Sequence, residues 1–227
     1  MFLEGTVVIL HRAEEDYLKL IYELQVEANK PLIKNFEIKD AFGYTDQSVN
    51  DMIKRLSDKK LVHFEPYKGV NLTKKGIEAA VKLVRAHRIW EVFLTRHLHY
   101  PWHKVHDEAE KLEHASSEHM IEEMYRFLGK PETCSHGNPI PKLDGQVIVI
   151  KDQMLFDMNP DDQFILERAT DDPYLLRLLD ELKLGLGDKL SIIEKDQYNE
   201  FMKILVKGKN VVITFPSAKK LFGRNIK

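Results

Sequence analysis

Apolar side chains recur at helical spacing through the first 130 residues of the chain. Tyr17, Ile21 and Leu24 lie three or four positions apart and predict a helix over residues 14–28. Pro31 follows, and because proline cannot continue the helical hydrogen-bond ladder, the helix is expected to end before it.

The next segment has the pattern of a helix-turn-helix with a wing. Helices are expected over residues 33–41 and 46–59, and Gly43 supplies the tight turn between them. Two short apolar runs, residues 61–66 and 70–73, then predict a pair of strands. Two strands directly after a second helix form a wing, and that helix would be the recognition helix.

Two longer helices are expected next, over residues 74–98 and 103–128, separated by Pro101. Residues 132–144 are loop-like. From residue 145 onward, the pattern changes to short apolar runs that predict strands. The expected strands are residues 146–150, 164–167, 189–194, 201–206 and 210–215, with a short helix over residues 173–182.

These elements predict a mainly α chain with a small β domain of SH3-like type, a C-terminal β-barrel. We expect a winged helix-turn-helix domain over residues 1–75, a helical domain over residues 76–143 and the SH3-like domain over residues 144–227. The 227 residues are 43% hydrophobic, and no apolar run approaches the roughly 20 residues of a membrane span. No secretory signal is expected either. The chain has one cysteine, which cannot form an internal disulfide, and we therefore expect a reducing cytoplasm.

A metal site is indicated by the distribution of histidine. Eight of the ten histidines, and the one cysteine, fall within residues 87–136. On a helix, His106, Glu110, Glu113 and His114 occupy one arc of about 100°. Because unpaired buried carboxylates are costly, an inward arc of this kind favours a bound divalent cation. The alternative is an exposed charged face on which the histidines occur by chance.

Two further features add to this interpretation. His87 and Glu91 share one face of the preceding helix, so that two metal sites are expected between antiparallel helices. Cys134 and His136 follow in the loop, where a metal role and an ordinary buried thiol are equally good interpretations.

A DNA-binding surface is indicated by local charge, because the formal net charge of −2 gives no such sign. Residues 54–75 include seven basic side chains and only two acidic ones. This basic segment covers the end of the recognition helix and the wing, where phosphates would lie. A solvated charged surface is the alternative. Gln47 and Asn50 could pair with adenine, and Asp51 would position its neighbours. The residues expected at the DNA are Thr45, Gln47, Ser48, Asn50, Asp51, Lys54, Arg55 and Lys68.

Several segments resemble the diphtheria toxin repressor family of metal-dependent transcriptional regulators, in its manganese-responsive branch. The specific ones are the segment from His106-Asp107-Glu108-Ala109-Glu110 to Glu113-His114 and the loop His136-Gly137-Asn138-Pro139-Ile140-Pro141. Asp16-Tyr17-Leu18 and Ala86-His87-Arg88 also match. The resemblance covers nearly the whole chain from about Glu14 and implies the same three-domain fold, with dimerisation through the helical domain.

The resemblance also implies a ligand set for two sites. The primary site would comprise Asp16, Glu110, Glu113 and His114. Cys134 would belong to either site, and the ancillary ligands would be His87, Glu91, His106, His136 and Asp171.

The ligand types favour manganese. Asp16 and Glu110 stand where the iron-responsive branch has a Met and a Cys, and hard carboxylates favour Mn²⁺ over metals that prefer sulfur, with Fe²⁺ or Zn²⁺ as alternatives. At position 19, some manganese regulators of the family have a carboxylate, whereas this chain has Lys19. This difference argues against a bridged two-metal cluster.

The resulting hypothesis is a metal-dependent homodimer that binds double-stranded operator DNA and represses metal-uptake genes. Bound metal would fix the separation of the two recognition helices. A di-metal carboxylate enzyme and a metal buffer without DNA binding are the alternatives. The enzyme is disfavoured because no Glu-x-x-His pair occurs. We therefore expect no enzymatic activity, no membrane association and no small organic ligand.

Overall fold

The computed structural model describes residues 9–143 and 152–226, so the strand expected over residues 146–150 lies outside the described residues. The chain divides into two compact units. One comprises residues 1–86 with 141–149, and the other residues 87–140 with 150–227. The three-domain boundaries expected from the sequence stay a prediction. No helix in the described part of the chain has the length and apolar content to cross a membrane.

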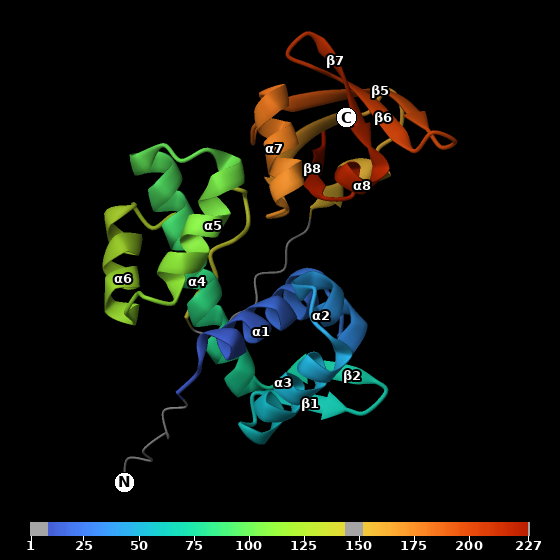
Figure 1. The fold of residues 1–227 in the computed structure, drawn as a ribbon. Helices are drawn as coiled ribbons and strands as arrows, with labels where there is room; N and C mark the ends of the chain where they lie inside the picture. The colour runs from blue at the N-terminus through green and yellow to red at the C-terminus, as the bar shows by residue number, and fades with distance from the viewer. Residues whose placement is uncertain (1–8, 144–151, 227) are drawn as a thin grey trace. The chain divides into compact units, whose positions relative to one another are not determined.

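The first unit contains the expected winged helix-turn-helix (Figure 1). Its elements are α1 (Arg12–Tyr22), η1 (Glu23–Glu27), α2 (Asn35–Phe42), α3 (Asp46–Asp58), β1 (Val62–Glu65) and β2 (Gly69–Leu72). Gly43 ends α2 in the left-handed region at φ 68°, and Thr45 caps α3 by accepting the Ser48 N–H at 3.2 Å. Val49 and Ile53 on α3 are fully buried, so that its opposite face is exposed.

The wing is a two-stranded antiparallel sheet in which Val62 pairs with Leu72 and Glu65 with Gly69. Helix α4 (Lys74–Leu98) follows and contributes residues to both units.

The second unit begins within α4 and differs from the sequence prediction at its next helix. Instead of one helix over residues 103–128, there are two, α5 (Trp102–Glu113) and α6 (Glu118–Phe127). Ser117 begins α6 by accepting the Met120 N–H at 3.2 Å. Met120 therefore lies on α6 rather than on the helix of the metal-ligand arc, and its side chain is 45% exposed. Ala109 and Glu113 on α5 are buried, as expected.

The C-terminal part is a six-stranded antiparallel sheet with strand order β3-β8-β4-β5-β6-β7 (Figure 1). Its elements are β3 (Gln153–Met154), η2 (Leu155–Asp157), β4 (Gln163–Ala169), α7 (Pro173–Leu182), β5 (Lys189–Asp196), β6 (Phe201–Val206), β7 (Lys209–Thr214), α8 (Phe215–Ala218) and β8 (Leu221–Asn225). Phe164, Leu176 and Ile204 pack in one apolar core between α7 and the sheet. The short α8 and the strand β8 were missed by the sequence analysis.

Candidate metal centres and DNA-binding surface

The last turn of α5 gathers three ligand-type side chains. Glu110, Glu113 and His114 each offer a ligand atom within 4.8 Å of the others. Glu113 is 3% exposed, and His114 Nε2 lies 3.5 Å from Glu113 Oε1. We refer to these three residues as the α5 cluster. Asp16 lies on α1, in the other unit, and its membership of the same site stays a prediction.

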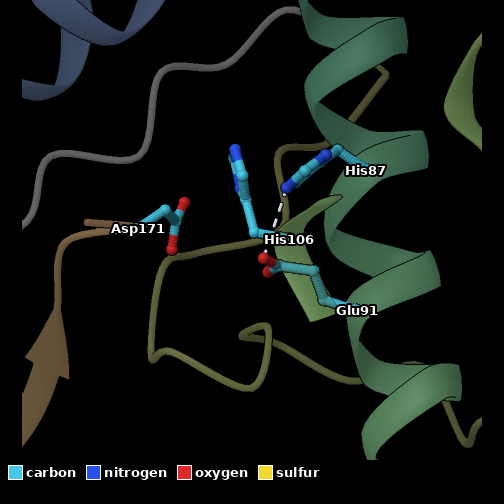
Figure 2. Close-up of side chains that lie close together, drawn as sticks. All are labelled: His87, Glu91, His106 and Asp171. Atoms are coloured by element: carbon cyan, nitrogen blue, oxygen red, sulfur yellow. Dashed lines mark hydrogen bonds and ion pairs between the residues drawn. The ribbon is translucent and has the colours of Figure 1, made fainter. Parts of the chain in front are cut away.

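A second cluster is centred on Glu91, whose side chain has no exposed surface. His87, Glu91, His106 and Asp171 converge from α4, α5 and the segment before α7, with one ligand atom each within 4.8 Å of the others (Figure 2). Glu91, Cys134 and His136 form an overlapping group within the same limit. We refer to these six residues as the Glu91 cluster.

The backbone of the 134–138 loop explains why Cys134 and His136 point to the same place. The Cys134 N–H donates to the Asn138 carbonyl at 2.8 Å, and the Gly137 N–H donates to the Cys134 carbonyl at 3.1 Å. Gly137 has φ 86°, and a Cβ there would lie 2.2 Å from the Glu167 carbonyl oxygen. Only glycine therefore lets β4 approach this loop.

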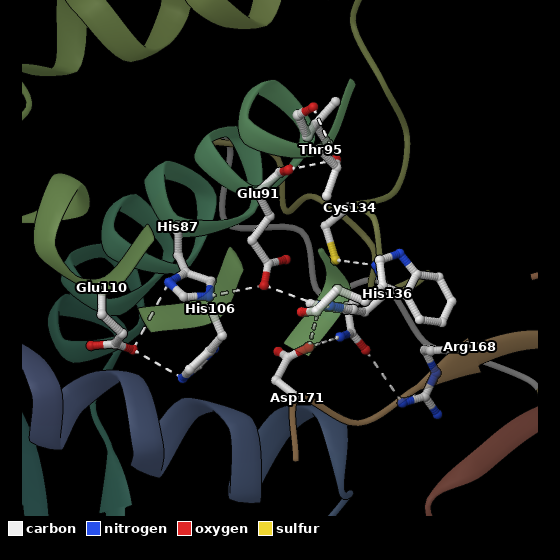
Figure 3. Close-up of polar contacts among 12 residues, drawn as sticks. His87, Glu91, Thr95, His106, Glu110, Cys134, His136, Arg168 and Asp171 are labelled. Atoms are coloured by element: carbon white, nitrogen blue, oxygen red, sulfur yellow. Dashed lines mark hydrogen bonds and ion pairs between the residues drawn. The ribbon is translucent and has the colours of Figure 1, made fainter. Parts of the chain in front are cut away.

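His136 is fully buried, and its two ring nitrogens have different partners (Figure 3). Nδ1 lies 2.8 Å from Asp171 Oδ1 and 3.0 Å from Glu91 Oε1. Nε2 lies 3.4 Å from the Trp102 carbonyl oxygen, which can only accept a hydrogen bond. A proton held on Nε2 by this carbonyl leaves Nδ1 available to coordinate a metal between the two carboxylates.

The pKa values show how strongly these groups interact. Burial lowers the pKa of His136, but Glu91 and Asp171 outweigh burial and hold it well above its ordinary value. Conversely, burial would raise the pKa of Glu91, but His136 and His87 hold it well below the usual range. Burial, together with the charge of Glu91, raises the pKa of the Cys134 thiol to about 12. A cation that binds here must therefore displace protons from His136 and Cys134.

His87 belongs to the Glu91 cluster and also contacts the α5 cluster. Its Nδ1 contacts Glu113 Oε2, and its Nε2 lies 3.2 Å from Glu91 Oε1. The His106 ring packs edge-on against the His87 ring at 4.8 Å, and its Nε2 lies 3.7 Å from Glu110 Oε1. The family resemblance implies one site for both histidines, whereas their contacts reach both clusters.

The composition of the Glu91 cluster fits a divalent metal ion. Glu91 Oε2 is buried, and no described residue offers it a hydrogen bond. A buried carboxylate oxygen without a donor is costly unless a cation lies against it. Imidazole, carboxylate and thiolate are also the usual protein ligands of divalent transition metals.

Three residues that support this cluster were not singled out from the sequence. Asn138 donates from Nδ2 to Asp171 Oδ1 at 3.1 Å, and Arg168 Nη1 lies 3.5 Å from Asn138 Oδ1 (Figure 3). Arg168 also donates from Nε to Asp152 at 2.7 Å. The third is Trp102, through its carbonyl. The sequence indicates a role for Asn138 only through its position, because it follows Cys134 and His136 in the same loop.

The recognition helix α3 presents most of the expected DNA-contacting side chains. Gln47, Ser48, Asp51, Lys54 and Arg55 are exposed. Gln47 Nε2 donates to both carboxylate oxygens of Asp51, at 3.0 and 2.9 Å, while the role of Asp51 at the DNA stays a prediction.

Three other residues of the expected set have local partners. Asn50 is half-buried, and its Oδ1 accepts a hydrogen bond from Asn35 Nδ2 at 2.6 Å. The Thr45 hydroxyl is the cap of α3. On the wing, Lys68 pairs with Glu65 at 2.7 Å and stays 71% exposed. Among the seven basic residues between positions 54 and 75, Lys59 points inward, and its Nζ lies 2.7 Å from Glu14 Oε2.

Comparisons with known proteins agree on one family. The model of the iron dependent repressor N-terminal DNA binding domain matches residues 10–70. The model of the iron dependent repressor metal binding and dimerisation domain matches residues 73–142.

Among the relatives, the HTH-type transcriptional regulator MJ0568 of Methanocaldococcus jannaschii is 38% identical over 116 residues, which are 51% of this chain and 92% of MJ0568. The diphtheria toxin repressor of Corynebacterium jeikeium is 33% identical over 57% of this chain, and the match spans 53% of its own length.

Solved structures match over a longer stretch. A manganese-dependent transcriptional repressor in complex with manganese has a TM-score of 0.86 at 30% identity, covering 94% of this chain and 100% of that one. The manganese regulator SloR has a TM-score of 0.80 at 34% identity, with 94% and 98% covered. The family is one of transcriptional repressors rather than enzymes. The chain therefore belongs to the iron-dependent repressor family of metal-dependent, DNA-binding transcriptional regulators, the family of the diphtheria toxin repressor.

Proposed function

We propose that this chain is a homodimeric repressor of metal-uptake genes, activated by Mn²⁺ and acting in the cytoplasm on a palindromic operator. The observation that carries the proposal is the convergence of buried carboxylates and imidazoles in the second unit, on a chain that also has an exposed recognition helix. Similarity to structures named as manganese-dependent repressors supports the choice of metal.

The α5 cluster and Asp16 form the proposed primary site. Bound Mn²⁺ would supply positive charge that removes the repulsion between the carboxylates. Glu110, Glu113 and His114 belong to the dimerising helices, whereas Asp16 belongs to the DNA-binding domain. Ligands shared between these domains would restrain the hinge and favour one separation of the two recognition helices, matched to major grooves about 34 Å apart. The domain boundaries near residues 75 and 143 are part of this proposal.

The Glu91 cluster forms the proposed second site. Glu91, His136 and Asp171 are the core ligands, since two carboxylates already face His136 Nδ1. The Cys134 thiolate would make this site softer than the all-oxygen and imidazole primary site, so that Zn²⁺ or Fe²⁺ competes more strongly here. His87 and His106 would respond to occupancy of either site.

Operator recognition is assigned to the exposed face of α3. Gln47 and Asn50 would contact base edges. Thr45 and Ser48 would contact the DNA at the start of the recognition helix. The basic side chains would contact the phosphates, namely Lys54, Arg55 and Lys68. Asp51 would hold the Gln47 amide in place.

The decisive experiment is fluorescence anisotropy with an operator duplex, selected from random DNA in the presence of Mn²⁺. We expect tight binding with Mn²⁺ and loss of binding with a chelator. Glu110→Ala and His114→Ala should abolish the response to metal while leaving the circular dichroism spectrum unchanged. His119→Ala removes an exposed histidine from the neighbouring helix and serves as the matched control. Equal binding with and without metal would overturn the proposal.

A further inference from the structure

The tip of the wing carries an aromatic side chain that is fully exposed among the described residues. Tyr67 is 103% exposed, the highest value among the large apolar side chains of the described residues. Neither its ring nor its hydroxyl makes a hydrogen bond or ring contact within the described part of the chain. Burial of this side chain therefore contributes little to folding, and its ring and hydroxyl are open to a partner molecule.

The backbone at this position makes the choice of tyrosine more informative. Tyr67 has φ 66°, in the left-handed region that glycine and asparagine adopt with less strain. The Lys68 N–H donates to the Glu65 carbonyl at 3.0 Å and closes the turn. Strain of this kind at a tip residue with no internal contacts points to an external function.

The wing is also held firmly at its base. Ile33 and Val70 exchange both backbone hydrogen bonds at 2.9 Å, which joins the segment before α2 to strand β2. Lys34 Nζ donates to the Lys68 carbonyl at 2.6 Å, one residue after Tyr67 in the chain. Gly69 permits this approach, because a Cβ there would lie 2.6 Å from the Ile33 carbonyl oxygen. The tip is thus presented in one position, and little entropy is lost when it binds.

The charges around the tip favour an anionic partner. Lys34 and Lys68 flank Tyr67, and Lys60 lies at the foot of the wing. Glu65 offsets part of this charge through its ion pair with Lys68. An exposed tyrosine between ammonium groups suits a phosphodiester backbone, where the hydroxyl donates to a phosphate oxygen and the ring packs on a deoxyribose.

We propose that Tyr67 is a DNA-backbone contact, placed by the wing on the duplex beside the major groove occupied by α3. The inference rests on the proposed function, since it requires operator binding. The contact adds affinity and fixes the orientation of the domain on the duplex, but it does not distinguish one base from another.

The test uses the Mn²⁺-loaded full-length protein and anisotropy titrations with two duplexes, the operator and a scrambled sequence. Tyr67→Asn removes the ring while keeping a residue suited to φ 66°. We expect it to weaken binding to both duplexes by a similar factor, about tenfold. Tyr67→Phe, which loses only the hydroxyl, should fall between this variant and wild type.

Salt dependence separates the ring from the neighbouring charge. The slope of log K against log salt should stay unchanged in Tyr67→Asn, because no charge is removed. In Lys68→Ala its magnitude should fall by about 0.9. Tyr198→Ala is the matched control, because Tyr198 is 93% exposed and lies in the turn between β5 and β6 of the C-terminal sheet.

Gln47→Ala makes the two possible failures distinguishable. If wild type binds neither duplex, the proposed function fails. If Gln47→Ala weakens operator binding while Tyr67→Asn binds like Tyr198→Ala, the Tyr67 contact alone is overturned. A loss confined to the operator duplex would also overturn it, since that result assigns Tyr67 to base recognition.

Discussion

At the scale of single residues, we expect the charge of Glu91 to contribute most to the stability of the second unit. It is fully buried, and both His87 and His136 contact its Oε1. Glu91→Gln keeps the shape but leaves the charge of His136 balanced by Asp171 alone. We expect the free energy of unfolding of the metal-free protein to fall by about 3 kcal/mol, measured by urea denaturation.

The matched control for this substitution is Glu194→Gln, which removes an exposed carboxylate from β5 in the same unit. It should change the unfolding free energy by less than about 0.5 kcal/mol. Equilibrium dialysis gives an independent measurement, in which Glu91→Gln should bind one fewer Mn²⁺ per chain than wild type. Equal stability and equal metal content would refute the central place given to Glu91.

Cys134 provides a second prediction at this scale. Because burial raises the pKa of its thiol to about 12, the metal-free protein holds a protonated, poorly reactive thiol at neutral pH. Binding of Co²⁺ to the Glu91 cluster should deprotonate Cys134 and produce a thiolate-to-metal charge-transfer absorption. Cys134→Ser should lack this absorption and release one proton fewer in a weakly buffered titration. An unchanged spectrum in the variant would remove Cys134 from the ligand set.

At the scale of elements, Glu37 shows how a helix start sets pH dependence. Its carboxylate accepts the Lys34 N–H at 2.9 Å, capping α2, and pairs with Lys30. Burial would raise the pKa of Glu37, but Lys30 and the Lys34 amide lower it below the model-peptide range. The carboxylate therefore stabilises the fold above a pH of about 4.5, and this contribution is lost as pH falls through the lower, folded-state value.

Substituting Glu37 by Gln should lower the free energy of unfolding at pH 7 by about 1 kcal/mol and flatten its decline below pH 4.5. Urea denaturation at several pH values measures both effects. Asp40→Asn, on the exposed side of the same helix, is the control and should change the free energy of unfolding at pH 7 by less than about 0.5 kcal/mol. A steeper acid decline in Glu37→Gln than in wild type would contradict the assignment.

Elements whose boundaries depend on local chemistry were predictable from the sequence. Residues 173–182 form α7 as expected, since Asp172 accepts the Tyr174 and Leu175 N–H groups at 2.9 and 3.0 Å at its start. The boundary between α5 and α6 was missed because the apolar spacing continues through it. Only the cap at Ser117 marks the break, and one serine competes weakly against periodicity.

The candidate site also has a part that local sequence predicts and a part that it does not. His106, Glu110 and Glu113 could be grouped from the sequence, because helical geometry alone puts them on one face. Asp171 was expected only through the resemblance, since it lies 80 positions after Glu91 and follows a strand. Its place depends on a tertiary contact, the hydrogen bond from Asn138, which no local pattern encodes.

At the scale of the whole molecule, the proposed function depends on two copies acting together, and the family to which the chain belongs dimerises. The second unit has an apolar surface suited to this role. Phe127 is 67% exposed on α6, and Leu98 is 53% exposed at the end of α4. The Phe127 ring centroid lies 5.1 Å from that of His97, which is exposed, and 6.5 Å from that of Phe93, which is half-buried, so the three rings form one patch. A patch of this kind on a two-fold axis would meet its own copy.

Phe127→Glu should therefore convert the dimer to a monomer, because the two-fold axis would bring two carboxylates together in an apolar interface. Analytical ultracentrifugation measures the change, and operator affinity should fall more than tenfold, since the half-sites would then be bound independently. Ile193→Glu is the control, a 47% exposed apolar side chain on β5, and it should stay dimeric. A dimeric Phe127→Glu variant with wild-type affinity would place the two-fold contact elsewhere, and the separation of the recognition helices would then have to be set by another surface.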